Sequence, residues 1–178
     1  MSKKMLKTAG ILFIAAQVLV LMGLTASYYL AEDVGEEIRL KTEPIDPRDL
    51  FYGDYVYLNY EISTLPEHLW RSTEPIPREG RNEKVFVLLE PCESVYCAEG
   101  VYHEKAEGKE GVWVSGLLNY YDQYSKTMRI QYGFEKYFVP ENTGTQWERR
   151  TEQFIVKISI TPWGQSRILE ISEEREEK

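Results

Sequence analysis

The sequence predicts a single-pass membrane protein whose remaining chain forms a mainly β domain, and two observations lead to this fold class. One uncharged stretch near the N-terminus is long enough to cross a bilayer as a helix. The chain beyond it alternates apolar and polar residues in short runs that are separated by turn residues, as antiparallel strands do. We therefore expect an antiparallel β-sandwich or small barrel-like domain with one short helix, preceded by a single transmembrane helix.

The uncharged stretch covers residues 8–31 and follows lysines at positions 3, 4 and 7. As a helix it would be about 36 Å long at roughly 1.5 Å per residue, which crosses a hydrocarbon core with some tilt. Because positively charged flanks stay in the cytoplasm, residues 1–7 are expected inside the cell and the chain from Glu32 onward outside it. The predicted location is therefore the cell membrane, with an extracytoplasmic C-terminal domain.

A cleaved signal peptide is the alternative, since residues 25–27 are small enough for a processing site. The apolar run is longer than the roughly 7–15 residues of a signal h-region. Tyr28 and Tyr29 also stand where an interfacial aromatic belt belongs. These observations favour an uncleaved anchor.

Composition allows one domain after the anchor, expected over residues 32–172 and followed by an acidic tail over 173–178. The formal charge of −8 becomes −11 when the three N-terminal lysines are left out. Such a surface repels phosphate backbones, so no nucleic-acid partner is expected.

Period-2 patterning predicts a first strand from Ile38 to Thr42, which ends before a proline, and a second from Tyr55 to Ser63. One face of the second strand is apolar and the other is more polar. The apolar face comprises Val56, Leu58, Tyr60 and Ile62, and the polar face comprises Tyr55, Tyr57, Asn59 and Glu61.

Residues 64–83 contain three prolines, a glycine and many charges, which indicates a long exposed loop. Residues 85–89 are apolar on both faces and predict a central strand, whereas Gly100 and the polar run 103–110 predict a connection between strands.

Two further strand pairs are expected, residues 112–121 with 128–134 and residues 154–160 with 166–171. Residues 144–152 are the only plausible helix beyond the anchor. In the first pair, the core-facing residues would be Met128, Ile130, Tyr132 and Phe134, and the outward-facing residues Arg129, Gln131 and Glu135.

The two cysteines, Cys92 and Cys97, are separated by four residues. Outside the cytoplasm thiols are not kept reduced, so a short-loop disulfide is the leading interpretation. Zinc binding would also need His68 and His103, without the paired spacing usual for such sites. No metal ligand is therefore assigned, and no cofactor is expected.

Residues 53–60 match the pattern Gly-Asp-Tyr-x-x-Leu-x-Tyr at all five specified positions. An Asp-Pro-Arg-Asp turn precedes the motif at residues 46–49, and a Gly-Phe-Glu-Lys-Tyr-Phe-Val-Pro-Glu segment follows at residues 133–141. The chain therefore resembles the GDYXXLXY family of bacterial membrane-anchored proteins. The resemblance implies no established reaction, but it implies association with a multi-spanning membrane protein.

The motif also has a physical interpretation. Gly53 permits a turn with positive φ, and Asp54 can accept bonds from backbone donors as the strand begins. Tyr55 lies on the opposite face from Leu58, which leaves room for a partner or ligand, although a purely architectural turn and strand is the simpler alternative. The motif and partner-binding candidates are Asp46, Arg48, Asp49, Gly53, Asp54, Tyr55, Tyr57, Leu58, Tyr60 and Glu141.

No catalytic residue is assigned, because the sequence contains no phosphate-binding loop, no nucleophile elbow and no His-Glu-x-x-His pair. We expect a non-enzymatic accessory subunit that binds a partner at the external face of the membrane. The alternative is a membrane-anchored hydrolase or a carbohydrate-binding domain. It would use Asp54 and Glu141 as carboxylates, with surface tyrosines as stacking platforms.

Overall fold

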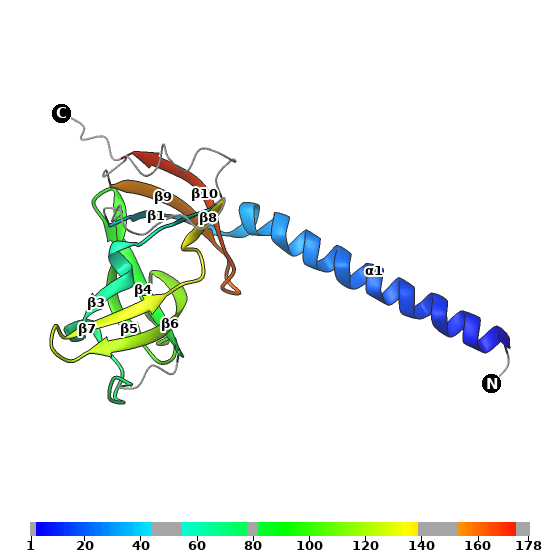
Figure 1. Ribbon diagram of the computed structural model, residues 1–178, viewed down its shortest axis with the longest axis horizontal. Coiled ribbons are helices and arrows are strands. Elements are labelled where there is room, and N and C mark those ends of the chain that lie inside the picture. Colours follow the sequence, from blue (N-terminus) through cyan, green and yellow to red (C-terminus); the bar gives the residue numbers. More distant parts are fainter. Residues whose placement is uncertain (1–2, 44–54, 78–81, 139–152, 174–178) are drawn as a thin grey trace.

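The structure, a computed structural model, describes residues 3–43, 55–77, 82–138 and 153–173 (Figure 1). A long helix, α1 (Lys3–Val34), projects from a β domain and leads almost directly into the first strand, β1 (Glu36–Lys41). Within α1, residues Lys7–Ala26 form a segment long and apolar enough to cross a membrane. The predicted combination of one apolar N-terminal helix and a mainly β domain is therefore confirmed.

The named strands pair antiparallel and fall into three groups. The first has the order β1-β9-β10, the second β2-β8 and the third β3-β7-β6-β4-β5. The remaining strands are β2 (Tyr55–Tyr57), β3 (Thr64–Pro66), β4 (Glu83–Cys92), β5 (Val95–Tyr102), β6 (Val112–Asp122), β7 (Thr127–Gln131), β8 (Lys136–Phe138), β9 (Phe154–Ile160) and β10 (Ser166–Glu173).

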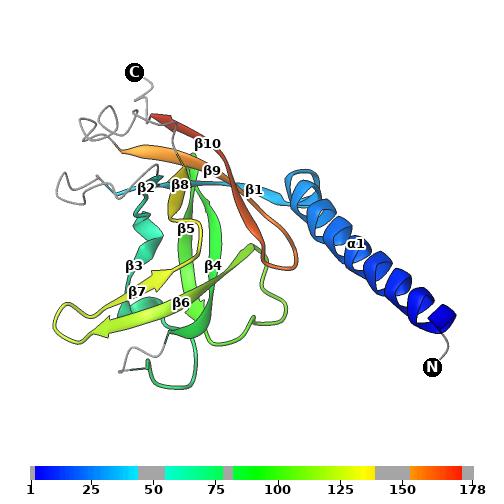
Figure 2. The same ribbon diagram turned by 45° about the vertical axis from the view of Figure 1, so that its right-hand side comes forward.

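Contacts between the three groups join the strands into a nearly closed antiparallel sheet. Of the two expected arrangements, sandwich and small barrel, this is the barrel-like one. β1 contacts β5, and Thr42 beyond the end of β1 forms an isolated bridge with Tyr60. Figure 2 shows the strands curving around a common interior. That interior holds the apolar faces of the strands, among them Ile38, Leu40, Val56, Leu58, Tyr60, Val85, Val87, Leu89, Met128, Ile130, Val156 and Ile158.

The strands predicted around residues 38–42, 85–89, 112–121, 128–134, 154–160 and 166–171 are present as β1, β4, β6, β7, β9 and β10. The predicted second strand is too long, since β2 ends at Tyr57 and a 3₁₀ turn, η1 (Glu61–Ser63), replaces its last residues. The Ser63 hydroxyl accepts a bond from the Tyr60 backbone N–H, and this local bond competes with strand pairing.

The expected loop over residues 64–83 is wrong at its start, where β3 and the short 3₁₀ helix η2 (Glu67–Leu69) lie. Buried Leu65 pairs with Met128 there, and Pro66 is tolerated because β3 is an edge strand. The expected connection is wrong at Gly100, which lies within β5, whereas residues 103–110 do connect β5 to β6 as predicted. The predicted helix over residues 144–152 lies outside the described residues.

The predicted disulfide is confirmed by a bond between Cys92 and Cys97, whose Cα atoms are 5.7 Å apart. The bond closes the turn between β4 and β5, where Cys92 pairs with Val95 and Cys97 with Glu90. Both thiols are used in this bond, so neither is left as the zinc ligand that the alternative interpretation requires.

Candidate functional site

The inner side of the motif strand, by which we mean residues 56–60, belongs to the core and is called the inner motif face. Val56, Leu58 and Tyr60 are buried, as the alternating pattern predicts. The Tyr60 hydroxyl donates a hydrogen bond of 3.0 Å to the backbone carbonyl of Phe134, and the two rings meet edge to face with centroids 5.2 Å apart. The last tyrosine of the motif therefore fixes the segment that follows β7 by packing and by a hydrogen bond.

The backbone of the motif connects segments that are far apart in the sequence. The Leu58 N–H donates to the Glu135 carbonyl at 2.7 Å, and the Asn59 carbonyl accepts from the Glu43 N–H at 2.8 Å. β2 itself pairs with β8, with Val56 opposite Tyr137. These bonds hold the short motif strand in place on both sides.

Glu135, expected to face outward, is instead only 4% exposed. Its carboxyl group accepts bonds from the backbone N–H groups of Tyr132 and, at 2.9 Å, of Gly133. Gly133 has a φ of +93°, a conformation that a side chain rarely adopts. This turn breaks the strict alternation of β7, so the residue after Phe134 no longer points to solvent.

The buried phenols around Glu135 remain hydrogen-bond donors at neutral pH. Burial, and secondly the charge of Glu135, raise the pKa of Tyr60 and of Tyr132 well above the ordinary tyrosine value. Tyr132 is 8% exposed and donates to the Ile62 carbonyl at 2.6 Å. Both hydroxyls therefore have a structural role as donors to backbone carbonyls.

The opposite side of the motif strand carries a row of linked polar side chains, which we call the outer motif face. Gln131 donates to the Tyr57 hydroxyl at 3.4 Å and accepts from the Asn119 amide at 3.4 Å. Arg129 donates to the Asn59 side-chain oxygen at 3.3 Å. The outer motif face comprises Tyr57, Asn59, Asn119, Arg129 and Gln131.

Tyr57 at this face is 40% exposed. Its pKa is raised first by partial burial and then by Glu135, while the Arg129 charge acts in the opposite direction. A neutral phenol on a hydrogen-bonded support is a typical anchor for protein recognition, because it offers apolar area and a polar tip with few rotatable bonds.

Exposed apolar side chains border the outer motif face. Leu117 pairs with Gln131 and is 41% exposed, and Tyr120 pairs with Arg129 and is 53% exposed. A hollow of about 240 Å³ adjoins Leu117. It is lined by Lys84, Ser115, Gly116, Leu117, Gln131, Tyr132 and Gly133. The face therefore combines oriented hydrogen-bonding groups, exposed apolar area and a small recess.

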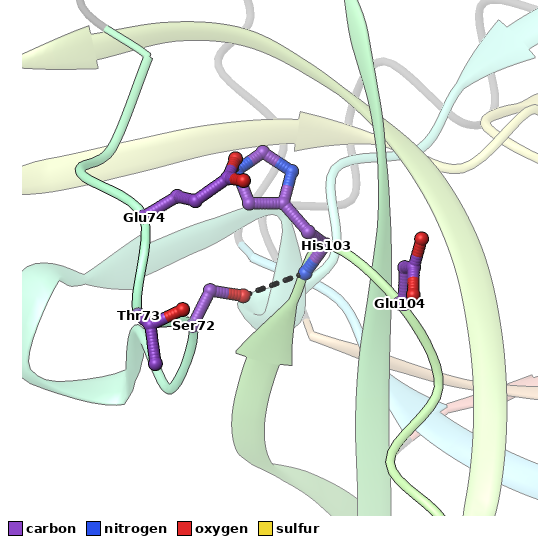
Figure 3. Close-up of a pocket in the computed structure, with 5 residues that line it drawn as sticks. All are labelled: Ser72, Thr73, Glu74, His103 and Glu104. Atoms are coloured by element: carbon purple, nitrogen blue, oxygen red, sulfur yellow. Dashed lines mark hydrogen bonds and ion pairs between the residues drawn. The ribbon is translucent and has the colours of Figure 1, made fainter.

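Sequence reasoning missed a second hollow of about 450 Å³, shown in Figure 3. Glu74 extends toward the imidazole of His103, and a carboxylate oxygen of Glu74 lies 3.5 Å from the His103 Nε2 atom. The Ser72 hydroxyl accepts a 2.8 Å bond from the His103 backbone N–H. Thr73 and Glu104 complete the lining. No sequence signal points to it, since its two sides are about thirty residues apart.

This hollow does not have the arrangement of a nucleophile and its base. In a serine hydrolase the imidazole receives the serine proton, whereas here the Ser72 hydroxyl accepts a bond from the His103 backbone N–H. The imidazole packs edge-on against Trp70, with ring centroids 4.9 Å apart.

Of the residues predicted to form the site, Leu58 and Tyr60 lie in the core and Tyr57 lies on the outer motif face. Tyr55 begins β2, and its side chain lies outside the described part of the chain. The remaining candidates also lie outside the described residues: Asp46, Arg48, Asp49, Gly53, Asp54 and Glu141. Sequence reasoning missed the contributions of Asn119 and Tyr120, which lie at an irregular pairing between β6 and β7.

A comparison with protein families finds one match, to the family described as "GDYXXLXY protein", over residues 17–171. No curated protein and no solved structure shows a significant match.

Proposed function

The chain belongs to the GDYXXLXY family, and on this premise we propose that it is a single-pass, membrane-anchored and non-enzymatic accessory subunit. α1 would cross the bilayer through residues 8–31, with the N-terminus in the cytoplasm and the β domain at the external face. The β domain would bind a multi-spanning membrane protein through the outer motif face.

The exposed apolar surface of α1 supports the anchor. Large side chains along it are more than half exposed, including Ile11, Leu12, Phe13, Leu19, Leu21 and Met22. A folded domain rarely leaves so much contiguous apolar area in water, so this surface needs lipid or protein around it. Lys3, Lys4 and Lys7 at one end favour a cytoplasmic N-terminus.

The single observation that carries partner binding is the two-sided motif strand. Leu58 and Tyr60 are needed by the core, whereas Tyr57 is exposed and is held by Gln131. A residue that only maintained the fold would not need such an oriented phenol beside exposed Leu117 and Tyr120. Aromatic side chains in this setting are the ones that carry binding energy at protein interfaces.

The hydrolase and carbohydrate-binding alternatives remain predictions from the sequence, since both depend on Asp54 and Glu141. The buried carboxyl group of Glu135, whose backbone carbonyl bonds to the motif at Leu58, already accepts two backbone hydrogen bonds. It supports the loop after β7, and its burial keeps it from a bound substrate.

We expect Tyr57→Ala to lose the membrane partner. The full-length protein would be crosslinked in its native membranes, purified in mild detergent and analysed by mass spectrometry. Tyr124→Ala is the matched control, because Tyr124 is fully exposed on the turn between β6 and β7. Removing the Tyr57 ring deletes an interface anchor, so recovery of a multi-spanning protein should fall at least about tenfold, or roughly 1.4 kcal/mol.

Recovery of the same partner at equal yield from all three forms would rule out the outer motif face as the binding surface. Recovery of no reproducible partner from the wild type would contradict the accessory role itself.

A further inference from the structure

The tip of the β9–β10 hairpin, residues 161–165, lies beside the end of α1. Ile160 at the end of β9 pairs both with Glu36, two residues after the helix, and with Ser166 at the start of β10. α1 contacts both strands of this hairpin. Figures 1 and 2 agree that the hairpin and α1 extend toward the same side of the domain.

The hairpin tip is a tightly bonded turn. The Gly164 N–H donates to the Thr161 carbonyl at 2.9 Å, and the Thr161 N–H donates to the Gln165 carbonyl at 2.8 Å. The buried Thr161 hydroxyl also accepts from the Gln165 N–H at 2.9 Å. Gly164 has a φ of +90°, and Pro162 stands at the second turn position, where proline is favoured. The backbone at the tip is therefore well fixed.

Trp163 stands at the apex of this turn with 54% of its surface exposed. None of the hydrogen bonds that hold the turn involves its side chain. Residues 161–166 carry no charge, although charged side chains make up 28% of the chain. An exposed indole on a rigid, uncharged tip suits the boundary between lipid headgroups and acyl chains, where tryptophan is enriched.

We infer that Trp163 inserts into the external interface of the same bilayer that holds α1, as a second contact between the β domain and the membrane. This inference rests on the proposed anchor. If residues 8–31 fill the hydrocarbon core, α1 ends at Val34 about 4.5 Å beyond its edge, at roughly 1.5 Å per helical residue. Residue 36 then lies up to about 11 Å beyond the edge, at roughly 3.3 Å per extended residue. From Ile160, which pairs with residue 36, the tip can extend up to about 10 Å toward the bilayer, at roughly 3.3 Å per residue. Since the interfacial layer is about 5–7 Å thick, Trp163 can reach it.

The charges near the hairpin favour insertion of the indole over attraction to anionic lipids. Arg167 follows the uncharged tip, while Glu36 and Glu37 are exposed beside the hairpin. The Glu37 carboxylate pairs with the Lys157 ammonium at 2.6 Å. Since no excess of positive charge accompanies the tip, binding should be independent of salt and should occur on zwitterionic lipid. Two contacts, α1 and Trp163, would fix the tilt of the β domain and hence the direction of the outer motif face.

The test uses the full-length protein reconstituted into phosphatidylcholine vesicles that carry bromine on their acyl chains, since bromine quenches tryptophan emission at short range. We expect a quenched component in the wild type, stronger with bromine near the headgroups than with bromine near the bilayer centre. Trp163→Phe should lose this component, and Trp70→Phe should retain it. Because Trp163 is exposed, its replacement should leave the thermal melt unchanged.

Equal quenching of the wild type and Trp163→Phe would overturn the inference, as would stronger quenching by deep bromines. Flotation of the vesicles in a density gradient separates this failure from failure of the anchor. Protein that floats with the vesicles but shows no Trp163 quenching contradicts only the hairpin contact. Protein that does not float contradicts both the anchor and the inference.

Discussion

Replacing Tyr60 by alanine is expected to cost about 3–5 kcal/mol of the free energy of unfolding, as for other large aromatic residues removed from a core. Tyr60 is fully buried and packs against Phe134, and its hydroxyl bonds to the Phe134 backbone. Truncation leaves a cavity and an unsatisfied carbonyl in the same place. Denaturant unfolding of the full-length protein in mild detergent, followed by near-ultraviolet circular dichroism, measures the loss.

Tyr60→Phe is the matched control for this prediction. It keeps the ring and removes only the hydroxyl, so the loss should be about 1–3 kcal/mol, the cost of a buried carbonyl that loses its donor. A loss below about 1 kcal/mol for the alanine variant would contradict the assignment of the inner motif face to the core.

Glu135→Ala is expected to destabilise the protein by about 2–6 kcal/mol, since it leaves two backbone N–H groups without their acceptor at about 1–3 kcal/mol each. These are the N–H groups of Tyr132 and Gly133. The change also frees the turn that carries the Phe134 carbonyl, the acceptor for Tyr60. The same unfolding measurement applies.

Glu135→Gln separates hydrogen bonding from packing. Glutamine keeps the shape and one side-chain oxygen of glutamate but turns an NH₂ group toward the second N–H. The free energy of unfolding of this variant should therefore lie between those of the wild type and Glu135→Ala. If the glutamine and alanine variants were equally stable, the hydrogen bonds would not be the reason that Glu135 is buried.

The inner motif face could be predicted from sequence because alternation alone decides it. Leu58 and Tyr60 are separated by two positions in an apolar series, and a strand must place both on one side. The same argument placed Met128 and Ile130 in the core. It failed at Glu135, where a glycine with positive φ changes the phase of the pattern.

The outer motif face could be predicted only in part. The position of Tyr57 could be predicted because it lies on the opposite face from Leu58. Its neighbours come from β6 and β7, about 60 to 75 residues further along the chain. Their meeting depends on strand order and on the register shift between Leu118 and Tyr120. Local patterns do not encode either feature. The same limit applies to the position of the β9–β10 hairpin near the end of α1, which depends on the pairing of β9 with β1.

The central claim is that the two faces of the motif strand have separate roles, with the inner face holding the fold and the outer face contacting a membrane partner. The two faces meet at the backbone of residues 56–60 and share no side chain. A substitution on one face should therefore change stability and a substitution on the other should change binding.

The most direct test places a photoactivatable phenylalanine at position 57 or at position 124 of the full-length protein in its native membranes. We predict a discrete adduct with a multi-spanning membrane protein from position 57 and no adduct from fully exposed position 124. Failure of position 57 to form an adduct, or the same products from both positions, would contradict the assignment of partner binding to the outer motif face.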